Sequence, residues 1–460
     1  MTSFKRSSLS VLCLLLLAAC AGKLRITTDP APGIRATVTP AATQTSVFDP
    51  LITPTSTQIA LQVPTTPILP TPGIPPGLVY APLASGEGFT PSSLDVFDMQ
   101  SGWAALDSIL PGGSGHLLRT RDGGLSWQEV TPPAGYPQGS RFFALDAQKA
   151  WAAPALVLPG QSVESGYIWR TVDGGQTWLP SEPVILQLQE ADLLESFLPQ
   201  ALDFVDPQHG WLVAAVGHYM HQDVLAIFST RDGGQTWQKL ADKFSMGQDS
   251  DGSAGMPCRV SGIAFVDLQR GFLAGDCLAV GVDENWSILA TSDGGRNWKT
   301  EPLAQSPRLP ASIQAGQFQC AATGVDRTPA GVLVQYTCLV LEASGMQKSA
   351  PFLFLTPNGG QNWVGWEAQA ASFANSVDGY SLGALQQDGT RQMLATGNGG
   401  QSWQALGVVA WPEARLDFPV LGQGFALAWR WNPERQAYDY ALVRSENGGQ
   451  SWDLVKGVIE

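Results

Sequence analysis

Seven acidic or amide side chains recur in one motif, Thr/Ser–x–Asp/Asn–Gly–Gly–x–x–Trp, and repeated carboxylates of this kind can act in acid–base chemistry or bind a hard metal ion. Three copies carry Asn, which keeps the hydrogen bonds of a turn but loses proton transfer. We therefore expect a structural turn, the GG turn, at every copy and no catalytic residue in it. The residues are Asp122, Trp127, Asp173, Trp178, Asp232, Trp237, Asp293, Trp298, Asn358, Trp363, Asn398, Trp403, Asn447 and Trp452.

The sequence around each GG turn predicts a β-hairpin. An apolar strand precedes each turn, two glycines permit the reversal, and the tryptophan begins the returning strand. A second hairpin pattern precedes each turn, most clearly in FVDPQHGW at 204–211. Two hairpins make four strands, and the turns recur every 40 to 65 residues. The sequence predicts an all-β, seven-bladed β-propeller with four antiparallel strands per blade over 82–460. Residues 184–198, within a long insertion, have helix-like apolar spacing.

The GG turns resemble the Asp-box, or bacterial neuraminidase, repeat. Together with the preceding hairpins they resemble the photosystem II assembly and stability factor family, and the similarity covers 88–460. This resemblance implies a seven-bladed propeller of an exported protein that helps to assemble a membrane complex. The basic patch that such factors use is not carried over, because this chain has a net charge of −14.

The N-terminus predicts export and lipidation. Lys5 and Arg6 precede a short apolar run that ends in Leu-Ala-Ala-Cys at 17–20, which resembles a bacterial lipobox. We expect a signal peptide over 1–19 and a lipid on Cys20; an ordinary secretory signal or an uncleaved anchor are the alternatives. Residues 20–81 read as a tether, since 27–81 contain 11 Pro and 12 Thr. The expected location is the bacterial cell envelope, outside the cytoplasm and anchored to a membrane by the lipid.

Of the six cysteines, Cys13 lies in the expected signal peptide and Cys20 is the expected lipidation site, and the remaining four suggest two disulfides in an oxidising compartment. Hairpin registers centred on 265–271 and 328–331 place Cys258 opposite Cys277 and Cys320 opposite Cys338. A four-cysteine zinc site is disfavoured because no Cys-x-x-Cys spacing occurs.

Other metal and ligand patterns are weak. His218, His221 and Asp223 can bind a transition metal only if a turn brings them together, and 249–252 resembles only the start of a calcium loop. No metal and no cofactor are therefore expected. Four tryptophans can stack on sugar rings, although packing between blades is the commoner role: Trp366, Trp411, Trp429 and Trp431.

The function predicted from these features is a non-enzymatic binding or assembly scaffold. No catalytic constellation stands out, and the acidic balance argues against nucleic acid as a partner. A monomer that docks a protein or membrane complex is expected, through long loops at 179–203, 239–260 and 299–318. The alternative is a sialidase-like glycoside hydrolase, but the chain lacks the Arg-Ile-Pro signature and shows no matching array of arginines and tyrosines. A purely structural envelope module is a third hypothesis.

Overall fold

A computed structural model describes residues 83–460 apart from 87, 107–113, 159, 187–191, 220–221, 245–259, 276–285, 304–316 and 342–346. All regular elements in this described part are β-strands, and none of it forms a helix able to cross a membrane. The helix-like spacing at 184–198 was therefore misleading: the described residues of that segment belong to β13 (Val184–Ile185) and the start of β14 (Asp192–Phe204). Cys20, Cys258 and Cys277 lie outside the described residues.

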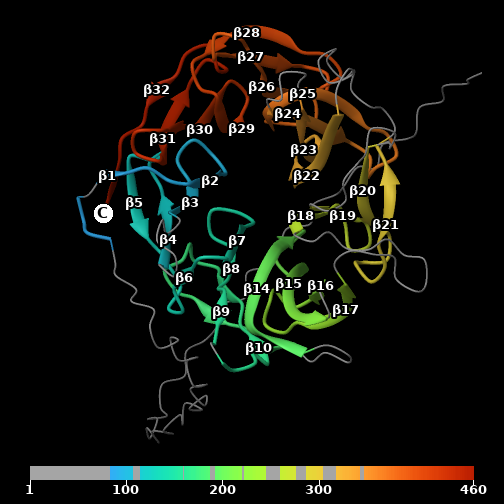
Figure 1. The fold of residues 1–460 in the computed structure, drawn as a ribbon. Coiled ribbons are helices and arrows are strands. Elements are labelled where there is room, and N and C mark those ends of the chain that lie inside the picture. The colour runs from blue at the N-terminus through green and yellow to red at the C-terminus, as the bar shows by residue number, and fades with distance from the viewer. Residues whose placement is uncertain are drawn as a thin grey trace, which may run out of the picture. The chain divides into compact units, whose positions relative to one another are not determined.

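The strands form sheets arranged around a common axis, as in a propeller (Figure 1). The first sheet contains β2 (Ser93–Val96), β3 (Gly102–Leu106), β4 (Ser114–Thr120), β5 (Ser126–Glu129), β33 (Gly457–Ile459) and β1 (Gly88–Phe89), with β6 (Tyr136–Pro137) beside β4. The second contains β7 (Arg141–Ala144), β8 (Ala150–Ala153), β11 (Trp169–Thr171) and β12 (Leu179–Pro180). The third contains β14, β15 (Gly210–Tyr219), β16 (Gln222–Thr230), β17 (Gln238–Phe244) and β9 (Leu156–Val157). Strands β10 (Ser165–Gly166) and β13 form a separate two-stranded antiparallel sheet.

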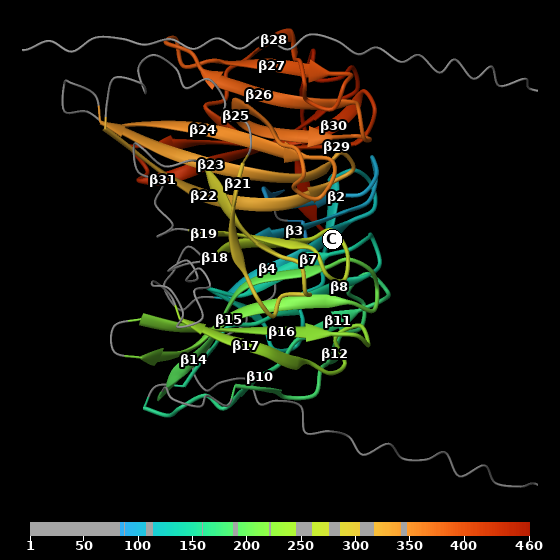
Figure 2. The same ribbon diagram turned by 90° about the vertical axis from the view of Figure 1, so that its right-hand side faces the viewer.

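The remaining strands form three more sheets. One contains β18 (Val260–Phe265), β19 (Gly271–Gly275), β20 (Ser287–Thr291) and β21 (Lys299–Pro302). The next runs through β22 (Gln317–Thr328), β23 (Gly331–Leu341), β24 (Gln347–Thr356), β25 (Val364–Phe373), β26 (Gly379–Leu385), β27 (Arg391–Thr396) and β28 (Gln404–Val409). The last contains β29 (Glu413–Val420), β30 (Gln423–Asn432), β31 (Ala437–Ser445) and β32 (Asp453–Leu454). Strands β14–β17 and β22–β24 extend toward the same side (Figure 2).

The expectation of seven separate four-stranded antiparallel sheets is corrected by this topology. Strand β25 pairs with β24 through its first half and with β26 through its second half, so the strands from β22 to β28 form one continuous sheet. The C-terminal β33 adds to β5 in parallel, and β1 pairs with β33 from the other side. The two ends of the described chain thus meet in the first sheet.

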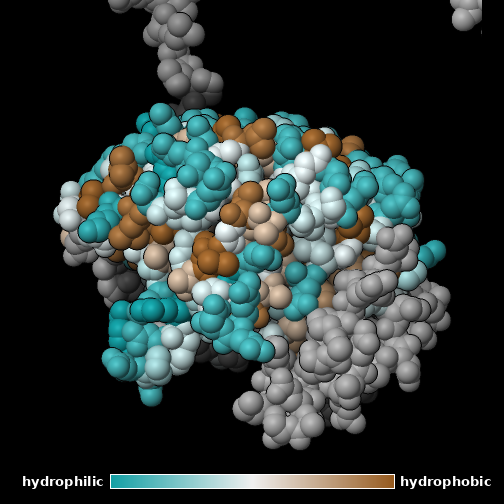
Figure 3. Space-filling model, turned by 90° about the horizontal axis from the view of Figure 1, so that it is seen from above, coloured by the Kyte–Doolittle hydropathy of each residue, from teal (hydrophilic) through white to brown (hydrophobic). Residues whose placement is uncertain are grey.

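Aromatic stacking joins neighbouring sheets. Trp151 of β8 stacks on Phe204 of β14 at 3.6 Å between ring centroids, and its indole N–H donates to the Gly233 carbonyl at 2.9 Å. Trp211 stacks in the same way on Phe265, also at 3.6 Å. These rings lie within continuous clusters of buried apolar side chains that span adjacent sheets. On the outer side shown in Figure 3, hydrophobic residues form small groups among hydrophilic ones.

The GG turns have the same hydrogen bonds in all seven copies. In one copy, Asp232 Oδ1 accepts from the Thr236 amide at 3.0 Å and from the Thr230 hydroxyl at 2.8 Å. Thr230 Oγ1 accepts in turn from the Gly234 amide at 2.9 Å. The copies with Asn use their amide oxygen identically, as Asn398 does toward Ser402 N at 3.0 Å. Gly233 and Gly234 have φ of 72° and 83°, a region that other residues rarely adopt.

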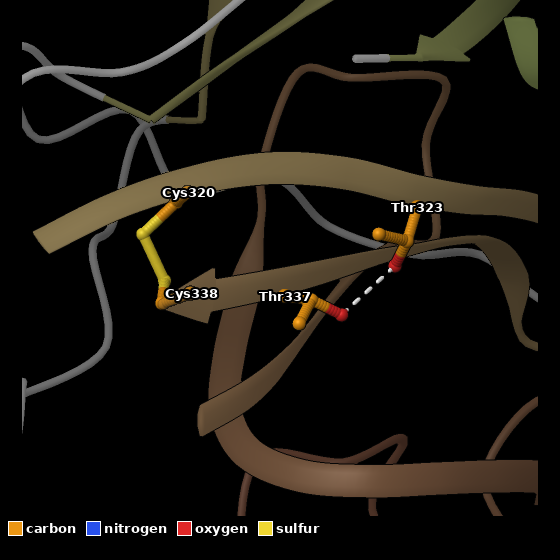
Figure 4. The surroundings of a disulfide bond; sticks show 4 residues. All are labelled: Cys320, Thr323, Thr337 and Cys338. Atoms are coloured by element: carbon orange, nitrogen blue, oxygen red, sulfur yellow. Dashed lines mark hydrogen bonds between the residues drawn. A yellow bond between two sulfur atoms is a disulfide. The ribbon is translucent and has the colours of Figure 1, made fainter. Parts of the chain in front are cut away.

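A disulfide joins Cys320 of β22 to Cys338 of β23, which are paired in register (Figure 4). Both cysteines are buried, at 1% and 0% exposure. Thr323 and Thr337 share a hydrogen bond of 3.3 Å beside it. The bridge therefore fastens the long β22–β23 hairpin within the apolar core.

We expect Thr230→Val to lower the free energy of unfolding by about 1–3 kcal/mol, because it leaves the buried Gly234 amide without its acceptor. Asp232→Asn should cost much less, since three copies of the turn already use Asn. Chemical denaturation of both variants checks this, and equal destabilisation would contradict the role given to the hydroxyl.

Replacing Cys320 and Cys338 together by alanine should destabilise the fold by about 3 kcal/mol through the lost constraint on the unfolded chain. The measurement is the denaturation midpoint of the double variant against the oxidised parent. A reducing agent should lower the denaturation midpoint of the parent by more than that of the variant, because only the parent has the Cys320–Cys338 bridge to lose.

Candidate carboxylate site on the innermost strands

The aspartates of the GG turns do not act as proton donors. Partial burial raises the pKa of the Asp232 carboxyl, but hydrogen bonds from Thr236, Thr230 and Gln235 outweigh it and leave the pKa below its usual value. Asp122, Asp173 and Asp293 show the same balance, and their pKa values are lowered. These carboxylates are ionised acceptors that hold a turn.

The innermost strands instead bring together four charged side chains that we call the axial cluster: Asp95 on β2, Asp326 on β22, and Arg415 and Asp417 on β29. Arg415 Nη2 lies 2.5 Å from Asp95 Oδ1, and water still reaches both side chains, which are 48% and 37% exposed. The positive charge of Arg415 interacts with all three carboxylates, and Asp95, the nearest, contributes most to raising the pKa of the guanidinium.

The local sequence explains how these groups reach the inside of the ring. Along β29, Ala414, Leu416 and Phe418 alternate with Arg415 and Asp417 and are buried at 0%, 5% and 0% exposure. Because side chains alternate between the two faces of a strand, the charged pair must share the opposite face.

Asp417 is a carboxyl group of this cluster that retains a proton to higher pH than an ordinary aspartate. Its Oδ2 accepts from the Val96 amide of β2 at 2.7 Å. Burial raises the pKa of Asp417 to about 7, with the charge of Asp95 adding to the effect and the Val96 amide and Arg415 opposing it. Desolvation by the surrounding inner strands likewise raises the pKa of Asp326, although water still reaches this residue, and the charge of Arg415 partly offsets the effect.

Asp203 on β14 occupies an equivalent position in the third sheet but has a different environment. Its Oδ2 accepts from the Phe265 amide at 2.7 Å, and its Oδ1 lies 3.0 Å from Arg327. Burial raises the pKa of Asp203 to about 6, although Arg327 lowers it. Ser372 makes the same inter-sheet bond to the Phe418 amide at 2.9 Å. Asp203 is only 2% exposed, so a ligand cannot reach it, and its hydrogen bond to Phe265 holds two neighbouring sheets together.

Sequence reasoning missed the axial cluster. The available signal was an aspartate between apolar residues in a predicted buried strand, as in Leu-Asp-Phe at 202–204 and 416–418 and Leu-Asp-Val at 94–96. That pattern places an aspartate on an innermost strand next to the neighbouring sheet. Only closure of the ring brings Asp95, Asp326 and Asp417 near one arginine.

The cluster combines the groups that glycosidic bond cleavage requires. Asp417 can hold a proton near neutral pH, and Asp95 lies against the Arg415 guanidinium. A protonated carboxyl group can give its proton to a glycosidic oxygen, and a neighbouring carboxyl group can assist the cleavage of the same bond.

A sialidase-type site is not formed by the described residues. Three arginines lie on innermost strands, but each already binds a protein acceptor: Arg141 the Gln200 carbonyl, Arg327 the Asp203 carboxylate and Arg415 the Asp95 carboxylate. Tyr336 is 1% exposed and donates to the Ser287 carbonyl, and burial raises its pKa, so it is no nucleophile.

The other residues singled out from the sequence lie elsewhere. Trp366 donates to Ser381 Oγ at 3.1 Å and Trp411 packs edge-on against Trp452, so both stabilise the sheets. Trp429 and Trp431 lie on β30 near the surface. His218 pairs with Asp223 in the backbone register of β15 and β16, while His221 lies outside the described residues. No group of three potential metal ligands occurs in the described part of the chain.

No protein-family model and no curated protein matches this sequence. Among solved structures, the chain is similar to a GH74 xyloglucanase from Xanthomonas campestris, with a TM-score of 0.47, 14% identity and coverage of 82% of this chain and 55% of that one. It is also similar to a GH93 α-L-arabinofuranosidase of Fusarium graminearum, with a TM-score of 0.39, 11% identity and coverage of 72% of this chain and 96% of that one. The similarity to a PL25 ulvan lyase has a TM-score of 0.38, 10% identity and coverage of 82% of this chain and 96% of that one. The chain spans little more than half of the xyloglucanase.

These similarities correct two expectations drawn from the sequence. The propeller fold is shared, but the matching proteins are glycoside hydrolases and a polysaccharide lyase, and the relationship to photosystem assembly factors is not supported. The expectation of a non-enzymatic scaffold is wrong for the same reason. The turns that suggested it specify the architecture of the fold and do not specify its chemistry.

The raised pKa values predict how stability depends on pH. Asp203 and Asp417 bind a proton more tightly in the folded state, so their contribution is complete below about pH 4 and is lost as pH rises through about 6 and 7. A tenfold difference in proton affinity between the folded and unfolded states corresponds to about 1.4 kcal/mol. The free energy of unfolding should therefore fall between pH 5 and pH 8.

Denaturation across that range should show a flatter pH dependence for Asp417→Asn, which keeps an oxygen acceptor without a charge. Asp232→Asn is the matched control, because the pKa of Asp232 is lowered and the group stays ionised throughout. An unchanged slope in Asp417→Asn would contradict the assignment.

Proposed function

We propose that this protein is a carbohydrate-active enzyme, a glycoside hydrolase with its catalytic groups in the axial cluster. One observation supports this most directly. A carboxyl group with a pKa of about 7 adjoins a solvent-accessible Asp95–Arg415 ion pair on the inner strands. Buried carboxyl groups elsewhere in the ring, such as Asp203, lack that access.

The three carboxyl groups have separate roles in this mechanism. Asp417 gives its proton to the glycosidic oxygen as the bond to the anomeric carbon breaks. Asp326, which is exposed on β22, takes a proton from the water whose oxygen bonds to that carbon. Asp95, which is paired with Arg415, stabilises the positive charge that develops on the sugar in the transition state.

We further propose that the ring contains seven blades, with β25 shared by two of them. Support comes from the seven equivalent GG turns and from the two halves of β25, which pair with different neighbours. The lipobox-like segment at 17–20 and the Pro/Thr-rich 20–81 support an enzyme held outside the cytoplasm by a lipid on Cys20. Polymeric substrates are available there.

The test incubates the purified full-length protein with xyloglucan, arabinan and ulvan and measures hydrolysis as the release of reducing ends. Asp417→Asn should lower kcat by about 100-fold or more, because the general acid is lost. Asp203→Asn is the matched control, since it changes the same inter-sheet bond away from the cluster, and it should retain activity within about threefold.

Three results would overturn the proposal. Failure to cleave any of the polymers would remove the hydrolase function. Equal losses in the two variants would show that the bond matters only for folding. Unsaturated products from ulvan would indicate elimination instead of hydrolysis.

A further inference from the structure

Four aromatic side chains occupy one face of the β30–β31 hairpin. Trp429 is paired with Tyr440 and Trp431 with Tyr438, directly across the two strands. The ring centroids lie 6.3 Å apart in the first pair and 5.2 Å in the second, and Tyr438 lies 6.4 Å from Tyr440. We call this group the aromatic ladder.

The ladder is exposed to an extent that hairpin stability does not require. Trp431, Tyr438 and Tyr440 are 52%, 49% and 38% exposed. None of the four rings belongs to an apolar core cluster of the described residues. Cross-strand aromatic pairs stabilise a hairpin, but a contiguous exposed aromatic surface is characteristic of a binding site.

The opposite face of the hairpin is charged. Asp439 lies 4.0 Å from Arg430, its partner across the strands, and 2.7 Å from Arg435 of the connecting turn, and the two arginine side chains are 72% and 69% exposed. The hairpin therefore has one face of ion pairs, typical of an ordinary surface, and one aromatic face.

The ladder continues the face of the sheet that bears the axial cluster. In the β29–β30 register, Glu413 lies opposite Trp429, and Asp417 lies opposite Phe425. The Trp429 indole N–H donates to Glu413 Oε2 at 2.6 Å, and Arg415 stands between Glu413 and Asp417 on the same strand face. At about 3.3 Å per residue, Glu413 lies about 13 Å along the strand from Asp417.

We propose that the aromatic ladder is a subsite for an uncharged polysaccharide whose chain extends from the axial cluster; this inference rests on the proposed hydrolase function. Flat aromatic faces match the C–H faces of pyranose rings, and Glu413 and the tyrosine hydroxyls border them as hydrogen-bonding groups. Arg415 is already bound to Asp95, and the chain has a net charge of −14, so an anionic polymer is disfavoured.

The experiment measures binding and cleavage separately for the full-length protein. Isothermal titration with barley β-glucan gives the affinity, with alginate as the anionic comparison. The double variant Trp431→Ala/Tyr438→Ala should bind β-glucan at least about tenfold more weakly. Arg430→Ala, on the other face of the same hairpin, should bind as the parent does, and Trp431→Phe should retain most of the affinity.

The outcomes separate the two proposals. Binding that depends on the ladder without any cleavage supports the subsite while the hydrolase function fails. The subsite is rejected if the parent does not bind β-glucan, if alginate binds more tightly, or if the double variant binds as well as the parent. An equal loss in Arg430→Ala also rejects it, because the effect would then come from hairpin folding.

Discussion

The stacking of an aromatic ring from one sheet on the innermost phenylalanine of the next is the contact on which the rest of the structure depends. At Trp211 and Phe265 the rings are nearly parallel, at 5°, and the indole N–H also binds the carbonyl of Gly294 in the following GG turn. One side chain thereby aligns a strand, its neighbour and a turn. The glycine before the aromatic residue is required too, since a Cβ on Gly210 would lie 2.5 Å from the Phe204 ring.

The same junctions between sheets also contain a hydrogen bond from a backbone amide of one innermost strand to a side-chain oxygen of its neighbour. An oxygen of Asp203, Ser372 or Asp417 accepts a hydrogen bond from a backbone amide near the C-terminal end of the next innermost strand. A carboxyl group in this position is desolvated, so it retains a proton to higher pH than an exposed aspartate. At Asp203 the consequence is structural. At Asp417 it supports the proposed acid role, because Asp95, Asp326 and Arg415 lie around it with access to water.

The two ends of the strands in the last sheet carry different groups of residues. The GG turns hold the strands with ionised or amide acceptors and lowered pKa values, which suits architecture and not proton transfer. The aromatic ladder and Glu413 lie at the other ends of the same strands, next to the start of β29. A polymer following that face would pass from apolar contacts to the charged cluster. The proposed catalysis and the scaffolding by the turns would therefore use different parts of the same sheet.

The GG turns could be predicted from the sequence, because Asp or Asn, two glycines and a following tryptophan satisfy a turn through local hydrogen bonds. The register of Cys320 with Cys338 followed from the hairpin for the same reason. The continuous pairing through β25 and the parallel addition of β33 to β5 depend on contacts between distant segments, which local patterns do not encode. The axial cluster is the clearest case, since Asp95 and Arg415 are 320 positions apart in sequence. Only closure of the ring makes them neighbours, and the burial that raises the pKa of Asp417 exists only once the sheets have packed.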